Sequence, residues 1–174
     1  MDTTGRMTAK LNELGFDFGQ FTIERFIIWL EQTTGRSIYL LGVRMPAGMY
    51  GAWISDAEHP HEYIFYDDTV PLLHQGHIQL HELSHFICQH KTYQVTSRGL
   101  QDVLRAIRKR VMPESMAESA RFRAANSKEE EVEAETLAML IQNRVIQYQR
   151  MNELERVVSD NEAAASLLSD LGID

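Results

Sequence analysis

Residues 72–90 read LLHQGHIQLHELSHFICQH, and the five residues His81-Glu82-Leu83-Ser84-His85 within them decide what the fold has to support. Residues four apart stand on the same face of a helix, so both imidazoles point in one direction. Apolar residues surround the pair and would hold such a helix against a core: Ile78, Leu80, Leu83, Phe86 and Ile87. The segment therefore predicts a buried helix that presents two histidines to a common point.

Two imidazoles at this spacing are suited to bind one zinc ion, at about 2.1 Å from each nitrogen. Glu82 is turned by about 100° from its neighbour around the helix axis, so it lies beside the metal rather than on it. From there its carboxylate can accept a proton from water. We therefore predict His81 and His85 as metal ligands, Glu82 as the catalytic base and one Zn²⁺ per chain as the cofactor. Manganese or iron is the alternative in a site with two histidines and one carboxylate.

The third ligand has to come from another part of the chain. All 7 histidines fall between His59 and His90, and the single cysteine, Cys88, lies in an apolar stretch that is typical of a small buried residue. A carboxylate from a later helix is then the natural candidate. Glu133 and Glu130 both lie at the edge of the apolar stripe of that helix, and spacing alone does not separate them.

Upstream of the motif, the sequence predicts one helix and three strands. Apolar residues at helical spacing over residues 20–35 indicate an amphipathic helix that ends at Gly35. Three β-rich runs follow, over residues 37–45, 50–55 and 62–66. Their short connections favour an antiparallel meander or a small mixed sheet, and a short, three-stranded, mostly antiparallel sheet is predicted. Strand 62–66 either offers its edge to an extended peptide or is an inner strand. Residues 1–19 are expected to be peripheral.

Downstream of the motif, the pattern is helical. Residues 97–112 form an amphipathic helix with Ser97 as its N-cap, and the small polar residues of 113–126 indicate a mobile connection. Ser127 and Glu130 form a capping box that opens a helix reaching about residue 149. Residues 152–174 are expected to be peripheral. A chain of 174 residues fits one domain. The predicted fold is a single α+β domain of the zincin type over residues 1–174.

Composition excludes several classes of function. The formal net charge of −8 argues against direct binding of nucleic acid, which requires concentrated Lys and Arg. No apolar run is long enough to cross a bilayer, and the first residues lack the apolar core of a secretory signal. The chain is therefore expected to be cytoplasmic, without a membrane partner.

Two motifs of this sequence resemble the ImmA/IrrE-type zinc metallopeptidases. The first is HELSH with the following Phe86-Ile87, and the second is the segment 133–138, Glu-Ala-Glu-Thr-Leu-Ala. The second resembles the family's E-A-x-x-F-A segment, with Leu137 where phenylalanine is usual. By this resemblance, which covers roughly residues 20–145, Glu133 is the third zinc ligand. The gap between the two motifs is longer than is usual, and Leu140-Ile141-Gln142 replaces the family's Leu-Met-Pro ending.

The resemblance implies a zinc-dependent endopeptidase that cleaves a regulatory protein. Members of the family are encoded by bacteria, phages and mobile elements, and several act on a helix-turn-helix repressor. The expected partner is therefore a transcriptional repressor. The alternatives are a non-enzymatic zincin-fold regulator, or a toxin component, that acts by binding a partner protein. A purely structural zinc site does not need Glu82, so this residue favours the enzyme.

A peptidase also needs a hydrogen-bond donor for the oxyanion that forms on the attacked carbonyl. Four residues near the motif are candidates that the sequence does not rank: His77, His90, Tyr66 and Tyr93.

Overall fold

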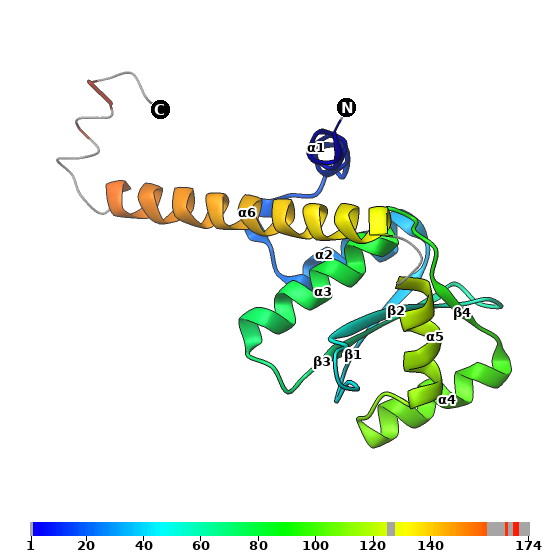
Figure 1. The fold of residues 1–174 in the computed structure, drawn as a ribbon. Helices are drawn as coiled ribbons and strands as arrows, with labels where there is room; N and C mark the ends of the chain where they lie inside the picture. Colours follow the sequence, from blue (N-terminus) through cyan, green and yellow to red (C-terminus); the bar gives the residue numbers. More distant parts are fainter. Residues whose placement is uncertain (1, 125–127, 160–165, 167–168, 171–174) are drawn as a thin grey trace.

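A computed structural model describes residues 2–124, 128–159, 166 and 169–170, and this part of the chain has an α+β fold with six α-helices and a four-stranded sheet (Figure 1). The predicted α+β class is therefore confirmed. In chain order the elements are α1 (Thr3–Glu13), the short 3-10 helix η1 (Phe18–Gln20), α2 (Ile23–Thr34), β1 (Ser37–Val43), β2 (Gly51–Asp56), β3 (His61–Asp67), α3 (Leu72–Ile87), β4 (Tyr93–Val95), α4 (Ser97–Lys109), α5 (Glu114–Ala124) and α6 (Lys128–Ser159).

The sheet has the strand order β1-β3-β2-β4. The pairing of β2 with β3 is antiparallel, whereas β1 pairs with β3 and β4 pairs with β2 in parallel. The three predicted strands exist and the sheet is mixed, as one of the two alternatives had it, but the prediction of a mostly antiparallel, three-stranded sheet is wrong. One reason is that β3 lies between β1 and β2 in the sheet and pairs with β1 in parallel. The other is that β4 is too short for its sequence pattern to be recognised. Because β3 has neighbours on both sides, it is an inner strand and offers no edge to a peptide.

Helices pack against both faces of the sheet. Neighbouring side chains of a strand point to opposite faces, so Ile64 contributes to one apolar cluster while Tyr63 and Phe65 contribute to the other. The first cluster joins the sheet to α1, α2, α3 and α6, and the second joins it to α4 and α5. Helix α3, which carries the motif, lies directly on β2 and β3. Leu83 of α3 is fully buried in the first cluster.

Helix α2 shows how local sequence sets the element ends. Thr22 caps its first turn by accepting a hydrogen bond from the backbone N–H of Arg25. Gly35 follows the last turn with φ of 69°, in the left-handed region that glycine adopts without steric cost. The predicted helix over residues 20–35, including its end at Gly35, is confirmed.

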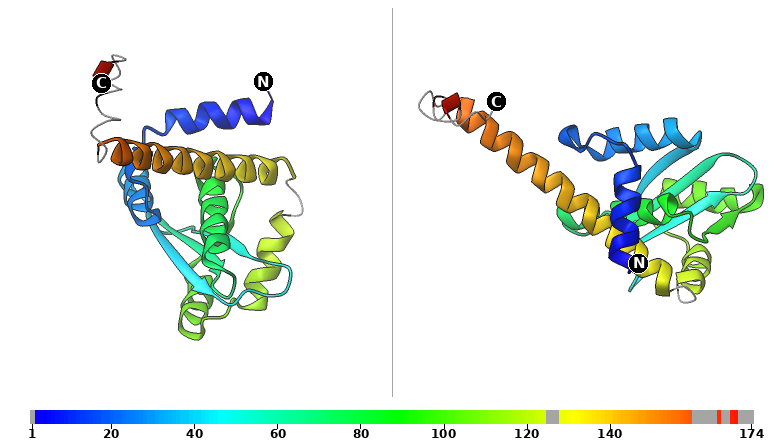
Figure 2. Two further views of the ribbon diagram at one scale, coloured as in Figure 1. Left: turned by 90° about the vertical axis from the view of Figure 1, so that its left-hand side faces the viewer. Right: turned by 90° about the horizontal axis from the view of Figure 1, so that it is seen from above.

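The N-terminal segment belongs to the core, contrary to the expectation that residues 1–19 are peripheral. Helix α1 crosses over α6 on the side away from the sheet (Figure 2). Its Met7 and Leu11 are buried in the first apolar cluster, together with Phe18 of η1. The sequence did not reveal that α1 contributes to the core, because its first turn is polar and only one narrow face of the helix is apolar.

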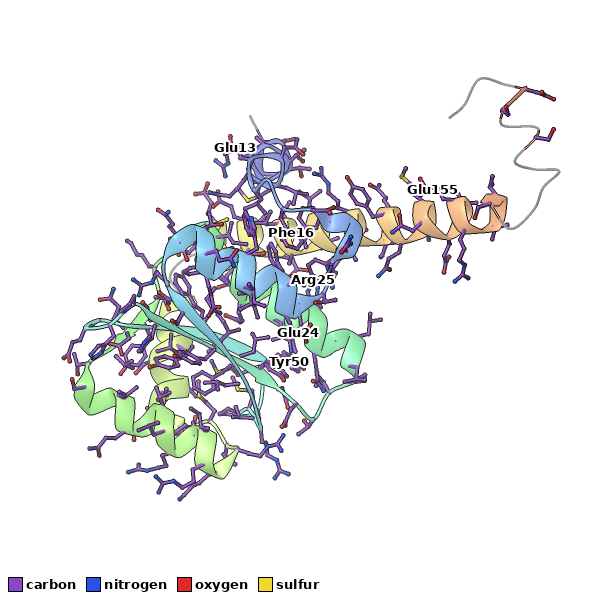
Figure 3. All side chains as sticks on the ribbon, turned by 180° about the vertical axis from the view of Figure 1, so that it is seen from behind. Glu13, Phe16, Glu24, Arg25, Tyr50 and Glu155 are labelled. Atoms are coloured by element: carbon purple, nitrogen blue, oxygen red, sulfur yellow. The ribbon has the colours of Figure 1, made fainter. Side chains whose placement is uncertain are left out.

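The segment 113–126 was expected to be a mobile connection, but the part of it that the structure describes, residues 113–124, is almost entirely helical. Residues Glu114–Ala124 form α5, whose Met116 and Ala117 are buried in the second apolar cluster. The predicted cap Ser127 lies outside the described residues. Helix α6 extends ten residues beyond the predicted end at residue 149, and its last turns, with Glu155, stand clear of the body (Figure 3). Within the described residues, no helix has both the length and the apolarity to cross a membrane.

Candidate metal centre

Helices α3 and α6 pack against each other, and their contact brings His81, His85 and Glu131 together as a group of potential metal ligands. The two imidazoles approach through their Nε2 atoms, which are 3.1 Å apart. Glu131 reaches the same point from α6. Its Oε2 lies 3.4 Å from His81 Nε2, and its Oε1 lies 3.5 Å from His85 Nε2. The sequence therefore identified two members of this group correctly, and the fold supplies the third.

These separations fit a tetrahedral zinc site. With zinc–ligand bonds of about 2.05 Å, two ligand atoms of a tetrahedron lie about 3.4 Å apart. The Nε2–Nε2 distance of 3.1 Å is close to that value, and Glu131 approaches the two rings with different oxygens, at 3.4 and 3.5 Å, so one ion would reach all three side chains after a movement of the carboxylate. The ring nitrogens and the carboxylate are also the donor types that zinc takes in proteins.

Both ring nitrogens of His81 face a carboxylate: Nδ1 lies 3.2 Å from Glu135 Oε2, and Nε2 lies 3.4 Å from Glu131 Oε2. In the neutral tautomer whose Nδ1–H donates to Glu135, Nε2 has a lone pair that can bind a cation. Glu135 also lies 3.2 Å from His77 Nε2, so this carboxylate braces two histidines of α3.

The charges of the group are strongly coupled. Hydrogen bonds to His81 and His85 lower the pKa of the Glu131 carboxyl to about 2. Burial lowers the pKa of His81, but hydrogen bonding to Glu131 and the charge of Glu82 outweigh it, so this pKa stands above its ordinary value. The carboxylate thus attracts positive charge into the space between the rings, as a metal site requires.

Glu133, the ligand that the resemblance implied, does not join this group. Its Oε1 lies 2.6 Å from Arg6 Nη2 and its Oε2 lies 3.0 Å from His90 Nε2. The reason is helical geometry: Glu131 and Glu135 share one face of α6, and Glu133, two residues from each, is turned well away from it. The matching four-residue spacing of Glu131–Glu135 and of His81–His85 is a signal in the sequence that points to the right carboxylates. Glu130 lines the nearby cleft but is not in the group.

Glu82 lies against the sheet at β2. Its side chain is buried, with a relative exposure of 9%, and burial raises the pKa of its carboxyl, while the charges of His81 and His85 act in the opposite direction. The backbone of β2 approaches so closely that a Cβ atom on Gly51 would stand 2.5 Å from Glu82 Oε1. Glycine at this position therefore makes room for the carboxylate.

A cleft with a volume of about 380 Å³ opens beside these residues. Helix α3 and the N-terminal part of α6 form one wall, and β2 with the residues before it and the start of β4 form the other. Residues 51–53 of β2 line the cleft and have no strand partner on their outer edge in the described part of the chain, but the carbonyl of Trp53 accepts a hydrogen bond from Thr92 Oγ1 and its N–H donates to Glu82. The lining includes His77, His81, Glu82, His85, Gly51, Trp53, Lys91, Thr92, Tyr93, Glu130 and Glu131.

The structure separates the four candidate oxyanion donors. Tyr93 and His77 line the cleft, but both ring nitrogens of His77 already contact Gln142 and Glu135. His90 is buried among other partners, and Tyr66 packs against Gly42, away from the cleft lining. Lys91, which the sequence did not single out, also lines the cleft and carries a positive charge. Tyr93 and Lys91 are therefore the better-placed donors.

Comparison of the chain with protein-family models, with curated proteins and with solved structures gives no match.

Proposed function

We propose that this protein is a zinc-dependent endopeptidase whose metal is held by His81, His85 and Glu131. The observation that carries the proposal is the convergence of two imidazoles and one carboxylate, with one ligand atom from each within 4.8 Å of the others, on the wall of an open cleft. Two imidazole nitrogens and a carboxylate oxygen are donor types that zinc takes in proteins, which supports a metal at this point. The buried Glu82 beside it has no part in such a ligand set, which supports a catalytic role.

Zinc bound here would supply Lewis acidity toward a carbonyl oxygen and toward water. Glu82 would accept the proton of the attacking water and return it to the leaving nitrogen. Its raised pKa suits both steps, since a general acid–base group works best when its pKa is close to the ambient pH. Tyr93 or Lys91 would donate to the oxygen that gains negative charge.

The open cleft beside the ligand group, with β2 in one of its walls, has room for an extended peptide and supports a peptide as the substrate. We further propose that the natural substrate is a regulatory protein such as a helix-turn-helix repressor of a phage or mobile element. This part rests on the resemblance of HELSH and of segment 133–138 to the ImmA/IrrE-type metallopeptidases.

The test compares the wild type with Glu82→Gln and with the control Glu130→Gln, which changes a carboxyl on the cleft wall outside the ligand group. Zinc content is measured by mass spectrometry. Cleavage of a peptide library prepared from a bacterial proteome is read in parallel. We expect about one zinc per chain in all three proteins, and a loss of cleavage by at least about a hundredfold in Glu82→Gln alone.

The outcomes separate the proposal from its alternatives. Wild-type protein without zinc would contradict the metal centre. Unchanged cleavage by Glu82→Gln would contradict the base assignment. A Glu82→Gln protein that keeps the biological effect of the wild type would favour the regulator or toxin that acts by binding alone.

A further inference from the structure

The two histidines of the centre are supported in different ways. His81 contacts a carboxylate directly, through Glu135. His85 instead contacts a third histidine: its Nδ1 lies 3.0 Å from His90 Nδ1. The other ring nitrogen of His90, Nε2, lies 3.0 Å from Glu133 Oε2, and Glu133 Oε1 lies 2.6 Å from Arg6 Nη2. We call Arg6, Glu133 and His90 the supporting arm.

The end of α3 places His90 for this contact. The last helical residues are followed by Gln89 with φ of 57°, in the left-handed region, which reverses the chain. The backbone N–H of His90 then donates to the carbonyl of His85 at 3.0 Å. This turn fixes the His90 ring under the ring of His85, where its relative exposure is 9%. The ring is therefore held by backbone as well as by side-chain contacts.

The arm determines which nitrogen of His85 carries a proton. The Glu133 carboxylate only accepts hydrogen bonds, so His90 Nε2 must donate to it. In a neutral His90 ring, Nδ1 is then the acceptor, and His85 Nδ1 must be the donor that faces it. In a neutral His85 ring, Nε2 then has a lone pair at the point that His81 and Glu131 share, where the metal would lie.

We propose that the supporting arm is a positioning device that holds His85 in its metal-binding tautomer and connects α1 to the metal centre. This inference rests on the metal centre of the proposed function. Arg6 secures one oxygen of Glu133, so that the other oxygen faces His90. The arm also gives Glu133 a role: it acts on the centre through His90, one residue removed from the metal.

Glu133→Gln tests the arm because it preserves shape and reverses the direction of the hydrogen bonds. Arg6 donates, so the single amide oxygen of Gln turns toward Arg6 and the amide N–H groups turn toward His90. His90 Nε2 then has to accept, its Nδ1 becomes the donor, and His85 Nδ1 becomes the acceptor. The proton of His85 moves to Nε2, where it opposes metal binding.

Two measurements on the full chain read this out. Zinc affinity is measured by competition with a chromophoric chelator. The tautomer of His85 is measured by ¹⁵N NMR of the histidine rings in the metal-free protein. We expect Glu133→Gln to lower zinc affinity by about ten- to a hundredfold and to shift His85 toward the Nε2–H tautomer. The matched control is Glu129→Gln, which also contacts Arg6, at 3.2 Å, and is mostly exposed. It should leave both readouts unchanged.

Each outcome decides the inference. Equal zinc affinity and an equal His85 tautomer in Glu133→Gln and wild type would overturn it. A loss of zinc as complete as in Glu131→Gln, with the His85 tautomer unchanged, would also overturn it and make Glu133 a ligand itself. If the wild type binds no zinc, the proposed function fails, and the tautomer in the metal-free protein still supports or overturns the arm.

Discussion

The two halves of α6 form one continuous helix but differ in burial and in tertiary contacts. Residues 128–145 pack against α1 and α3, bury Ala134, Leu137, Ala138, Ile141 and Val145, and carry Glu131, Glu133 and Glu135 toward the metal centre. Residues 146–159 form the same helix but are almost entirely exposed, with Leu154 at 64% and Val157 at 60% (Figures 1 and 3).

This difference shows that the packing of α6 on α3 both builds the core and positions the residues of the candidate site. The apolar stripe of the proximal half fixes the rotation of α6 about its axis, and that rotation decides which glutamates face α3. If α6 were displaced by two residues along its helical path, Glu133 would face α3 in place of Glu131. The distal half has comparable residues, but they are almost entirely exposed, so the same residue types do not set the rotation of the helix there.

The largest expected effect is on the metal. Glu131→Gln removes a charged ligand, and we expect zinc affinity to fall by more than about a hundredfold, the upper range for residues that only orient ligands. Glu153→Gln in the exposed distal half is the matched control and should change zinc affinity by less than twofold. The measurement is chelator competition. Equal affinities of the two variants would break the assignment of the site to the proximal half.

The second prediction concerns stability. Leu137 is fully buried in the first apolar cluster, and Leu137→Ala should lower the free energy of unfolding by about 2–5 kcal/mol through lost burial and a cavity. Leu154→Ala should change it by no more than about 0.5 kcal/mol. Urea unfolding followed by circular dichroism measures both. A similar loss for Leu154→Ala would show that the distal half is covered in solution.

The third prediction concerns zinc removal. A ligand that binds only the folded state at a hundred times its Kd stabilises that state by about 2.7 kcal/mol. We expect chelation to increase amide hydrogen exchange in residues 131–141, which pack on α3, and to leave residues 146–159 unchanged. Exchange is followed by mass spectrometry. A uniform change along the whole helix would mean that its two halves unfold together.

The smallest effect is expected at the last tertiary contact of the distal half, where Asn152 Nδ2 lies 3.2 Å from the carbonyl of Gly19. Asn152→Ala removes one exposed hydrogen bond and improves helix propensity, so the free energy of unfolding should change by about 0.5 kcal/mol or less. Thermal unfolding provides the measurement. A loss above 1 kcal/mol would show that η1 anchors the helix more strongly than its exposure suggests.

Elements that depend on local sequence signals could be predicted, whereas contacts between residues far apart in the sequence could not. The helix over residues 20–35 and the strands near 37–45, 50–55 and 62–66 could be predicted, because periodicity and turn residues are local signals. Helix α5 was missed because its sequence is polar, and the burial of Met116 and Ala117 depends on the far face of the sheet. The order of the strands was also missed, because β1 pairs directly with β3 although β2 lies between them in the sequence.

The sequence by itself determined the pair His81 and His85 and the neighbouring Glu82, because their relation depends only on the pitch of one helix. It also determined that a carboxylate from the later helix is available. The tertiary structure alone places Glu131 beside His81 and His85, Glu135 at His81 Nδ1, and Glu133 at His90, which contacts His85. The physical reason is that these relations depend on how α6 is rotated against α3, and many separate burial contacts, distant in the sequence, set that rotation together.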